Sequence, residues 1–128
     1  MMAEKAKLMG DESTRQMILQ AKDNPRRQQA LGKQVDPWNE NLWIANREEI
    51  VFKGNLAKFT QNAELKAFLL SSDDAVIAEA SPADKIWGIG MKRIDPRAMN
   101  ELEWEGSNLL GKALMRAREQ IKQKQASS

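Results

Sequence analysis

The stretch NENLWIANREEIVFKGNLAKFT, residues 39–60, is the longest segment with a helical pattern in this chain. At about 100° per residue, one side of the helix collects apolar residues, namely Ala45, Phe52, Leu56 and Phe59. Roughly the opposite side collects a mixed set, namely Trp43, Arg47, Ile50, Gly54 and Lys58. Apolar residues on two sides predict a central helix with neighbours on both.

Helical signals continue on both sides of this segment. Upstream, residues 2–9 are good helix formers that Gly10 stops, and the sequence DEST opens a second helix. Asn24 and Pro25 begin a short third helix. Downstream, Asn62 caps the helix AELKAFLL, and SNLLGKALMRAREQIKQK forms an amphipathic last helix with Leu110, Leu114, Ala117 and Ile121 inward.

The segment AVIAEA, residues 75–80, is the one predicted strand, because it is rich in small and branched residues. A lone strand leaves its backbone groups unpaired, so it needs a partner. That partner is either KIWGIGM or a strand upstream of this chain. We therefore predict an α+β, mainly helical fold with one or two short strands, in a single domain over residues 1–128 with a frayed tail at 125–128.

Composition limits the available chemistry. The 128 residues contain no cysteine and no histidine, which excludes disulfides, thiol nucleophiles, imidazole bases and the usual zinc ligands. Acid–base groups must be carboxylates or lysines. The formal charge of +2 is too even to indicate duplex DNA binding by charge. We see no apolar run of about 20 residues and no signal-peptide core, and we expect a cytoplasmic protein.

The stretch ASPADKIWGIGM, residues 80–91, is the first candidate site. Gly88 and Gly90 free the backbone for close approach to a ligand, and Trp87 offers a flat face on which a base or sugar can stack. Asp84 could place a carboxylate beside that face. The alternative is that Trp87 fills the end of the core, as most tryptophans do, and that the glycines serve the turn.

The mixed side of the central helix is the second candidate. Trp43 and Arg47, with Lys58 further along, could hold a stacked ring and a phosphate. Lys53 and Asn55 flank Gly54 and have the same ambiguity. The alternative is a partly exposed stripe whose long side chains cover apolar neighbours.

The order of LWIANREEIVFKGNLAKFTQNAELKAFLL, AEASPADKIWGIGM and WEGSNLLGKALMRAREQI closely resembles the NADAR family, also called YbiA-like. The resemblance runs from Met1 to about Ile121, and the pairing of WGIG with NLLGKALM is specific. It implies an N-glycosidase that hydrolyses a ribosyl N-glycosidic bond in a phosphorylated nucleotide-like substrate. That substrate is a riboflavin-biosynthesis intermediate or ADP-ribosylated guanine in nucleic acid. No metal, cofactor or membrane is expected.

The resemblance also marks positions of a site. Asp84 matches the acidic residue of a DxxWG motif and Trp87 an aromatic position, and we take these two as the catalytic candidates. Positions with a matching aromatic, basic or helix-opening residue are Trp43, Lys5, Lys53, Lys58 and Asn108. With Arg47 and Gly88 from the residue patterns, these form the predicted substrate-binding set.

Two departures from the family matter. The family's N-terminal strand and the glutamate of its EQY or EHY element would precede Met1, so the resemblance describes a truncated domain whose activity is in question. Some members also carry an aspartate where this chain has Ile89. The alternative function is therefore a non-catalytic helical module that binds ADP-ribose, a nucleotide or a protein partner.

Overall fold

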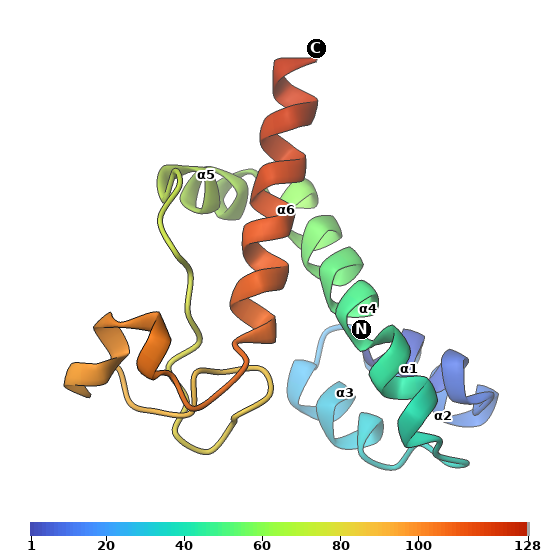
Figure 1. Cartoon of the computed structure of the whole chain (residues 1–128). Helices are drawn as coiled ribbons and strands as arrows, with labels where there is room; N and C mark the ends of the chain where they lie inside the picture. The colour runs from blue at the N-terminus through green and yellow to red at the C-terminus, as the bar shows by residue number, and fades with distance from the viewer. Residues whose placement is uncertain (128) are drawn as a thin grey trace. The chain divides into compact units, whose positions relative to one another are not determined.

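The computed structural model describes residues 1–127, and their regular structure is helical (Figure 1). Six α-helices follow in order: α1 (Met2–Met9), α2 (Glu12–Gln20), α3 (Pro25–Gly32), α4 (Glu40–Gln61), α5 (Ala63–Ser71) and α6 (Leu109–Ala126). Two 3-10 turns, η1 (Pro96–Met99) and η2 (Glu101–Glu103), precede α6. The mainly helical prediction is confirmed. The chain divides within α4 into two compact units: a first unit, Met1–Val51, and a second unit that begins at Phe52.

The helix starts follow the capping residues that the sequence indicated. The Asn24 side chain accepts the backbone N–H of Arg27 at 3.0 Å, and Pro25 fills the first turn of α3. The Asn62 side chain accepts the N–H of Leu65 at 3.1 Å and opens α5. Gly10 ends α1 with a φ of 78°, a left-handed conformation that glycine adopts without strain. Local side-chain chemistry therefore fixes these boundaries.

The core of the first unit lies among α1, α2 and α3. Its buried side chains are Ala6, Met9, Ile18, Leu31 and Val35. Trp43, near the start of α4, packs against this cluster. The segment before α4 is tied down as well, since Asp36 donates its N–H to the Asp11 carboxylate at 2.9 Å and Asn39 donates its N–H to the sulfur of Met9 at 3.3 Å. The entry to α4 is thus held against α1 and α2.

The second unit is organised around α6. The buried apolar face of α6 carries Leu109, Ala113, Ala117 and Ile121. All four residues Leu110, Leu114, Ala117 and Ile121 were predicted to face inward. Ala117 and Ile121 are buried, whereas Leu110 and Leu114 are only half-buried. Helix α5 contacts α6 (Figure 1), and Arg118 donates from α6 to the Ser72 hydroxyl at 2.8 Å. The predicted frayed tail, 125–128, is helical to Ala126, and Ser128 lies outside the described residues.

The strand predicted at residues 75–80 is wrong, and no strand occurs among residues 1–127. A buried side chain takes the place of a pairing strand. Asn108 accepts the Glu79 N–H at 3.0 Å and donates to the Ile77 carbonyl at 2.9 Å. KIWGIGM contributes one backbone bond to this segment, from the Ile89 N–H to the Glu79 carbonyl at 2.9 Å. These bonds hold the segment at Ile77 and Glu79 without a sheet.

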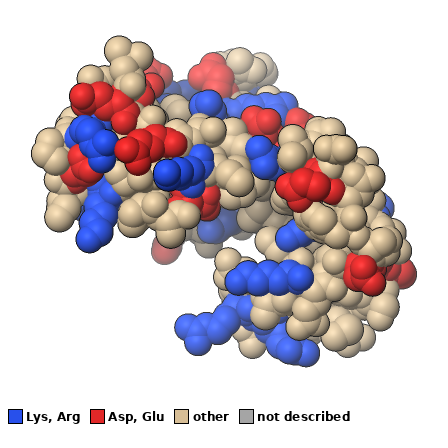
Figure 2. Space-filling model, turned by 60° about the horizontal axis from the view of Figure 1, so that its bottom comes forward, with Lys and Arg blue, Asp and Glu red and all other residues tan. Residues whose placement is uncertain are grey.

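Neither sign of charge dominates the face of the molecule drawn in Figure 2. Basic and acidic side chains intermingle over much of the face that Figure 2 draws. No helix within residues 1–127 combines the length and the apolar character that crossing a membrane requires.

Candidate active site

The first unit brings Lys5 of α1 onto two tryptophans. The Lys5 ammonium lies 4.9 Å from the ring centroid of Trp38 and 5.3 Å from that of Trp43. The two ring centroids are 5.8 Å apart, and their planes are tilted by 52°. At these distances the ring faces attract a cation. Lys5 and Trp43 were both predicted from the sequence to bind substrate, and the fold places them together.

The electrostatics of Lys5 are unusual for a lysine. Burial lowers the pKa of Lys5 below its usual range, the carboxylate of Glu40 acts to raise that pKa, and the cation of Lys33 acts to lower it. A lysine with a lowered pKa releases its proton more readily than a solvated one. The protonated amine can hold an anion, and the neutral amine can act as a base or a nucleophile. Perturbed lysines of this kind gather at functional sites.

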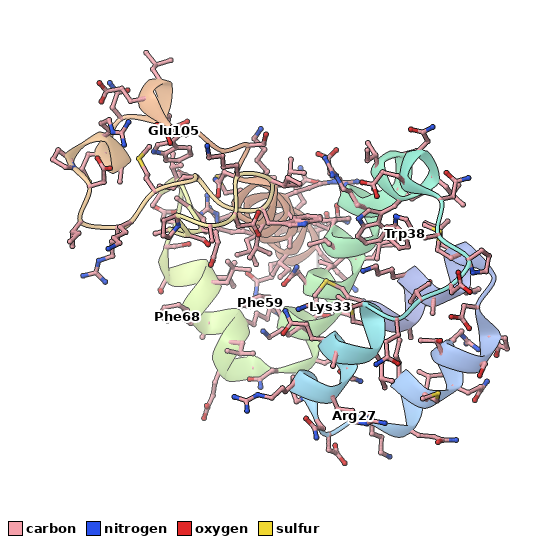
Figure 3. The ribbon with its side chains drawn as sticks, turned by 90° about the horizontal axis from the view of Figure 1, so that it is seen from below. Arg27, Lys33, Trp38, Phe59, Phe68 and Glu105 are labelled. Atoms are coloured by element: carbon pink, nitrogen blue, oxygen red, sulfur yellow. The ribbon has the colours of Figure 1, made fainter. Side chains whose placement is uncertain are left out.

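Trp38 is the residue that the sequence reasoning missed. It lies on the segment that enters α4 (Figure 3), and its indole N–H donates to the Glu40 carboxylate at 2.7 Å. It precedes Asn39, whose side chain caps α4 by accepting the Leu42 N–H at 3.0 Å. The available signal was a tryptophan next to a capping residue and five positions before Trp43. Its contact with Lys5 joins residues far apart in the sequence, so spacing alone could not reveal it.

The other predicted basic residues are spread along α4. Arg47 is half-buried and follows Trp43 by one helical turn. Lys53 lines a groove of about 330 Å³ between α4 and α6, and the Lys58 ammonium lies 5.7 Å over the ring of Phe59. Five residues of helix turn the side chains of Lys53 and Lys58 about 140° apart, so these two do not converge on one point.

In the second unit, Asp84 and Trp87 belong to one tight turn. Oδ1 of Asp84 accepts the backbone N–H of Ile86 at 3.0 Å and that of Trp87 at 2.8 Å. The Asp-x-x-Trp spacing is therefore that of a capped turn. Oδ2 of Asp84 accepts no hydrogen bond from residues 1–127 and remains available to a water or a substrate. Trp87 is half-buried in this turn.

The NADAR domain is the family whose model matches this chain, over residues 1–122. The chain belongs to the NADAR family. It is 41% identical over 123 residues to an N-glycosidase of Acanthamoeba polyphaga mimivirus, covering 96% of this chain and 72% of that protein. It is 35% identical over 79 residues to N-glycosidase YbiA of Escherichia coli, covering 62% of this chain and 42% of that protein.

A plant protein shares part of the same region. The chain is 37% identical over 78 residues to the riboflavin biosynthesis protein PYRR, chloroplastic, of Arabidopsis thaliana, covering 61% of this chain and 11% of that protein. The chain thus spans less than half of the E. coli and Arabidopsis relatives. Relatives named N-glycosidase place this NADAR chain in an enzyme family.

The two NADAR motifs that carried the resemblance form one packed structure. The N–H groups that open α6 donate to the turn at residues 86–88: Asn108 to Gly88 at 2.9 Å, Leu109 to Ile86 at 3.1 Å and Leu110 to Trp87 at 3.1 Å. The free N–H groups at a helix start often bind phosphate. In α6, these three N–H groups already donate to carbonyls of the loop. WGIG and the last helix therefore act together to hold the Asp84 turn.

Gly88 and Asn108 serve this packing. A side chain on Gly88 would meet the carbonyl oxygens of Glu79 and Asp84 at 2.8 Å, so the close backbone approach at Gly88 is to the protein itself. Asn108 is 1% exposed, and both polar atoms of its side chain bond to backbone. Ile89 is also 1% exposed and lies in the core.

Proposed function

We propose that this NADAR chain carries the site of an N-glycosidase, which hydrolyses a ribosyl N-glycosidic bond in a phosphorylated nucleotide-like substrate. The observation that carries the proposal is the Lys5 amine over the faces of Trp38 and Trp43, in a chain whose relatives are named N-glycosidases. The cluster offers both a flat apolar surface for a ring and a basic group for an anion or a proton.

The chemistry assigns further roles. Cleavage of an N-glycosidic bond passes through an oxocarbenium-like sugar, which a carboxylate stabilises or which a carboxylate-activated water attacks. Oδ2 of Asp84 is the candidate carboxylate oxygen, because Oδ1 is already held by two N–H groups. Trp87, in the same turn as Asp84, would stack on a ring of the substrate. In the first unit, Trp43 would stack on a ring, and Lys5 and Arg47 would meet a phosphate group.

Two substrates fit this proposal. The name of the Arabidopsis relative supports an intermediate of riboflavin biosynthesis. The family resemblance supports ADP-ribosylated guanine as the second. Both present a base, a ribose and phosphate, which are the groups that aromatic faces and cations recognise.

Release of the sugar phosphate tests the proposal. The purified chain should release ribose 5-phosphate from a ribosylaminopyrimidine phosphate, or ADP-ribose from an oligonucleotide that carries ADP-ribosylated guanine. Binding of either compound without release would contradict the enzyme proposal and favour a non-catalytic binding module. The aliphatic Ile89, at a position that carries an aspartate in some members, is the feature that keeps this second function in view.

A further inference from the structure

Trp38 and Glu40 form a pair. Neither residue belongs to the family motifs or to the mixed side of the central helix. The Trp38 indole N–H donates to Oε2 of Glu40 at 2.7 Å, which fixes the direction of the ring. Trp38 is 41% exposed. Its indole ring is therefore held in one direction although Trp38 is not a core residue. A partly exposed tryptophan with a fixed orientation is arranged to contact something other than the core.

That contact is the Lys5 amine. Nζ of Lys5 lies closer to the Trp38 ring, at 4.9 Å, than to the Trp43 ring, at 5.3 Å. The charged groups that act on this amine are Glu40 at the start of α4 and Lys33 just after α3. Glu40 therefore acts twice, since it orients the Trp38 ring by a hydrogen bond and attracts the Lys5 charge through space.

We propose that Trp38 and Glu40 are positioning residues for Lys5, which hold its amine over Trp43 where the substrate binds. This inference rests on the proposed function for its biological meaning. The position and the surroundings of the Lys5 amine can nevertheless be measured without enzyme turnover. Trp38 supplies the ring face that shields the amine from water, and Glu40 supplies the opposing charge.

Trp38 and Glu40 have opposite effects on the pKa of Lys5, so substitutions at the two positions should shift it in opposite directions. Removing the Trp38 ring relieves burial of Lys5, which lowers its pKa, and also removes a cation–π contact, which raises it. Because burial is the largest influence on this amine, we expect the pKa of Lys5 to rise. Replacing Glu40 by glutamine keeps an oxygen acceptor for the Trp38 N–H but removes the charge that raises the pKa of Lys5. In that variant the pKa of Lys5 falls further.

The direct test is an NMR titration of the full chain labelled in its lysine side chains, with Lys5→Arg used to assign the Lys5 signal. We expect a Lys5 pKa below 10.5 in the unmodified chain, a higher value in Trp38→Ala and a lower value in Glu40→Gln. Trp38→Phe keeps a ring face and should restore most of the shift, which also covers the case in which the alanine variant folds poorly. Trp104→Phe is the matched control, since the Trp104 indole N–H donates to the Ala98 carbonyl in the second unit.

An unchanged Lys5 titration in both Trp38→Ala and Glu40→Gln would overturn the proposal. If the chain releases sugar phosphate, Glu40→Gln should shift the pH profile of kcat/KM in the direction of the Lys5 titration, and Trp38→Ala should raise KM about tenfold or more by misplacing the amine. If no sugar is released while the Lys5 titrations follow the expected order, the proposed function fails and the positioning inference stands.

Discussion

Asp84 divides its two carboxylate oxygens between structure and chemistry. Oδ1 caps the turn that leads to Trp87, whereas Oδ2 is unpaired within residues 1–127. A substitution can therefore separate the two roles. An asparagine retains an oxygen that accepts the two N–H groups but has no charge, and an alanine loses both.

Asp84→Asn should consequently leave the thermal midpoint nearly unchanged and lower sugar-phosphate release about 10²- to 10⁴-fold, the usual effect of losing a catalytic acid or base. Asp84→Ala should lower the thermal midpoint as well. Thermal unfolding and single-turnover release on the same samples provide the measurements. Full turnover in Asp84→Asn would rule out Asp84 as the catalytic carboxylate.

Asn108 gives a second prediction at this scale, and it concerns stability. Asn108→Ala removes two hydrogen bonds, to the Glu79 N–H and the Ile77 carbonyl, and each such bond contributes about 0.5–1.5 kcal/mol. The free energy of unfolding in urea should fall by about 1–3 kcal/mol. Lys112→Ala, an exposed change on the same helix, is the control. An equal effect of both changes would mean that the Asn108 bonds do not stabilise the fold.

Single residues of the site were predictable in part. Lys5 and Trp43 were found through the family motifs, and their contact appears only in the fold, because 38 positions separate them in the chain. Trp38 carried no motif and was not found. The roles of Gly88 and Asn108 in backbone packing were hidden as well, since a glycine or an asparagine can serve a ligand or a chain segment equally well.

Whole elements were more predictable than their partners. Helix starts depend on side chains within four residues, and the caps at Asn24 and Asn62 were read correctly. The strand at residues 75–80 was not, because propensity reports an extended backbone but not what satisfies it. Here Asn108, about 30 residues away, provides the bonds that a sheet would provide.

The cap of α2 leads to a pH-dependent prediction. The pKa of Asp11 lies below its ordinary value of 3.8 because Thr14 and the N–H of Asp36 hydrogen-bond to its carboxylate. As the pH falls, the unfolded chain takes up this proton first, so the stabilisation by Asp11 is complete above 3.8 and is lost as the pH falls through the folded pKa. The thermal midpoint of the unmodified chain should therefore decline over that range.

Asp11→Asn keeps an acceptor for the cap but cannot titrate, so its thermal midpoint should change less steeply between about pH 5 and pH 2. The comparison needs thermal scans of the two proteins across that range. Parallel pH profiles would show that the Asp11 charge does not contribute.

At the scale of the whole molecule, the single-domain prediction remains to be tested. The chain forms two compact units, and α4 contributes residues to each. One domain should unfold in a single transition that a core change in either unit shifts. Ile18→Ala in the first unit and Ile121→Ala in the second each remove a buried side chain, at a cost of about 2–5 kcal/mol.

We expect both variants to move one common transition in calorimetric scans, with equal calorimetric and van't Hoff enthalpies for the unmodified chain. Two transitions, each shifted by only one of the variants, would show that the units unfold separately and that the single-domain prediction is wrong.

The carbonyl of Ile89 accepts the N–H groups of both Glu105 and Gly106, at 3.1 Å and 2.8 Å. The chain between Ile89 and Glu105 therefore forms a loop whose two ends lie together. This loop carries Ile94, Met99 and Leu102, which are 85–94% exposed. The entropic cost of closing such a loop grows slowly, by about 0.6 kcal/mol for each doubling of its length. We therefore expect residues 92–104 to accept an inserted epitope or reporter peptide without change to the turn that holds Asp84, because the bonds that close the loop lie outside this segment.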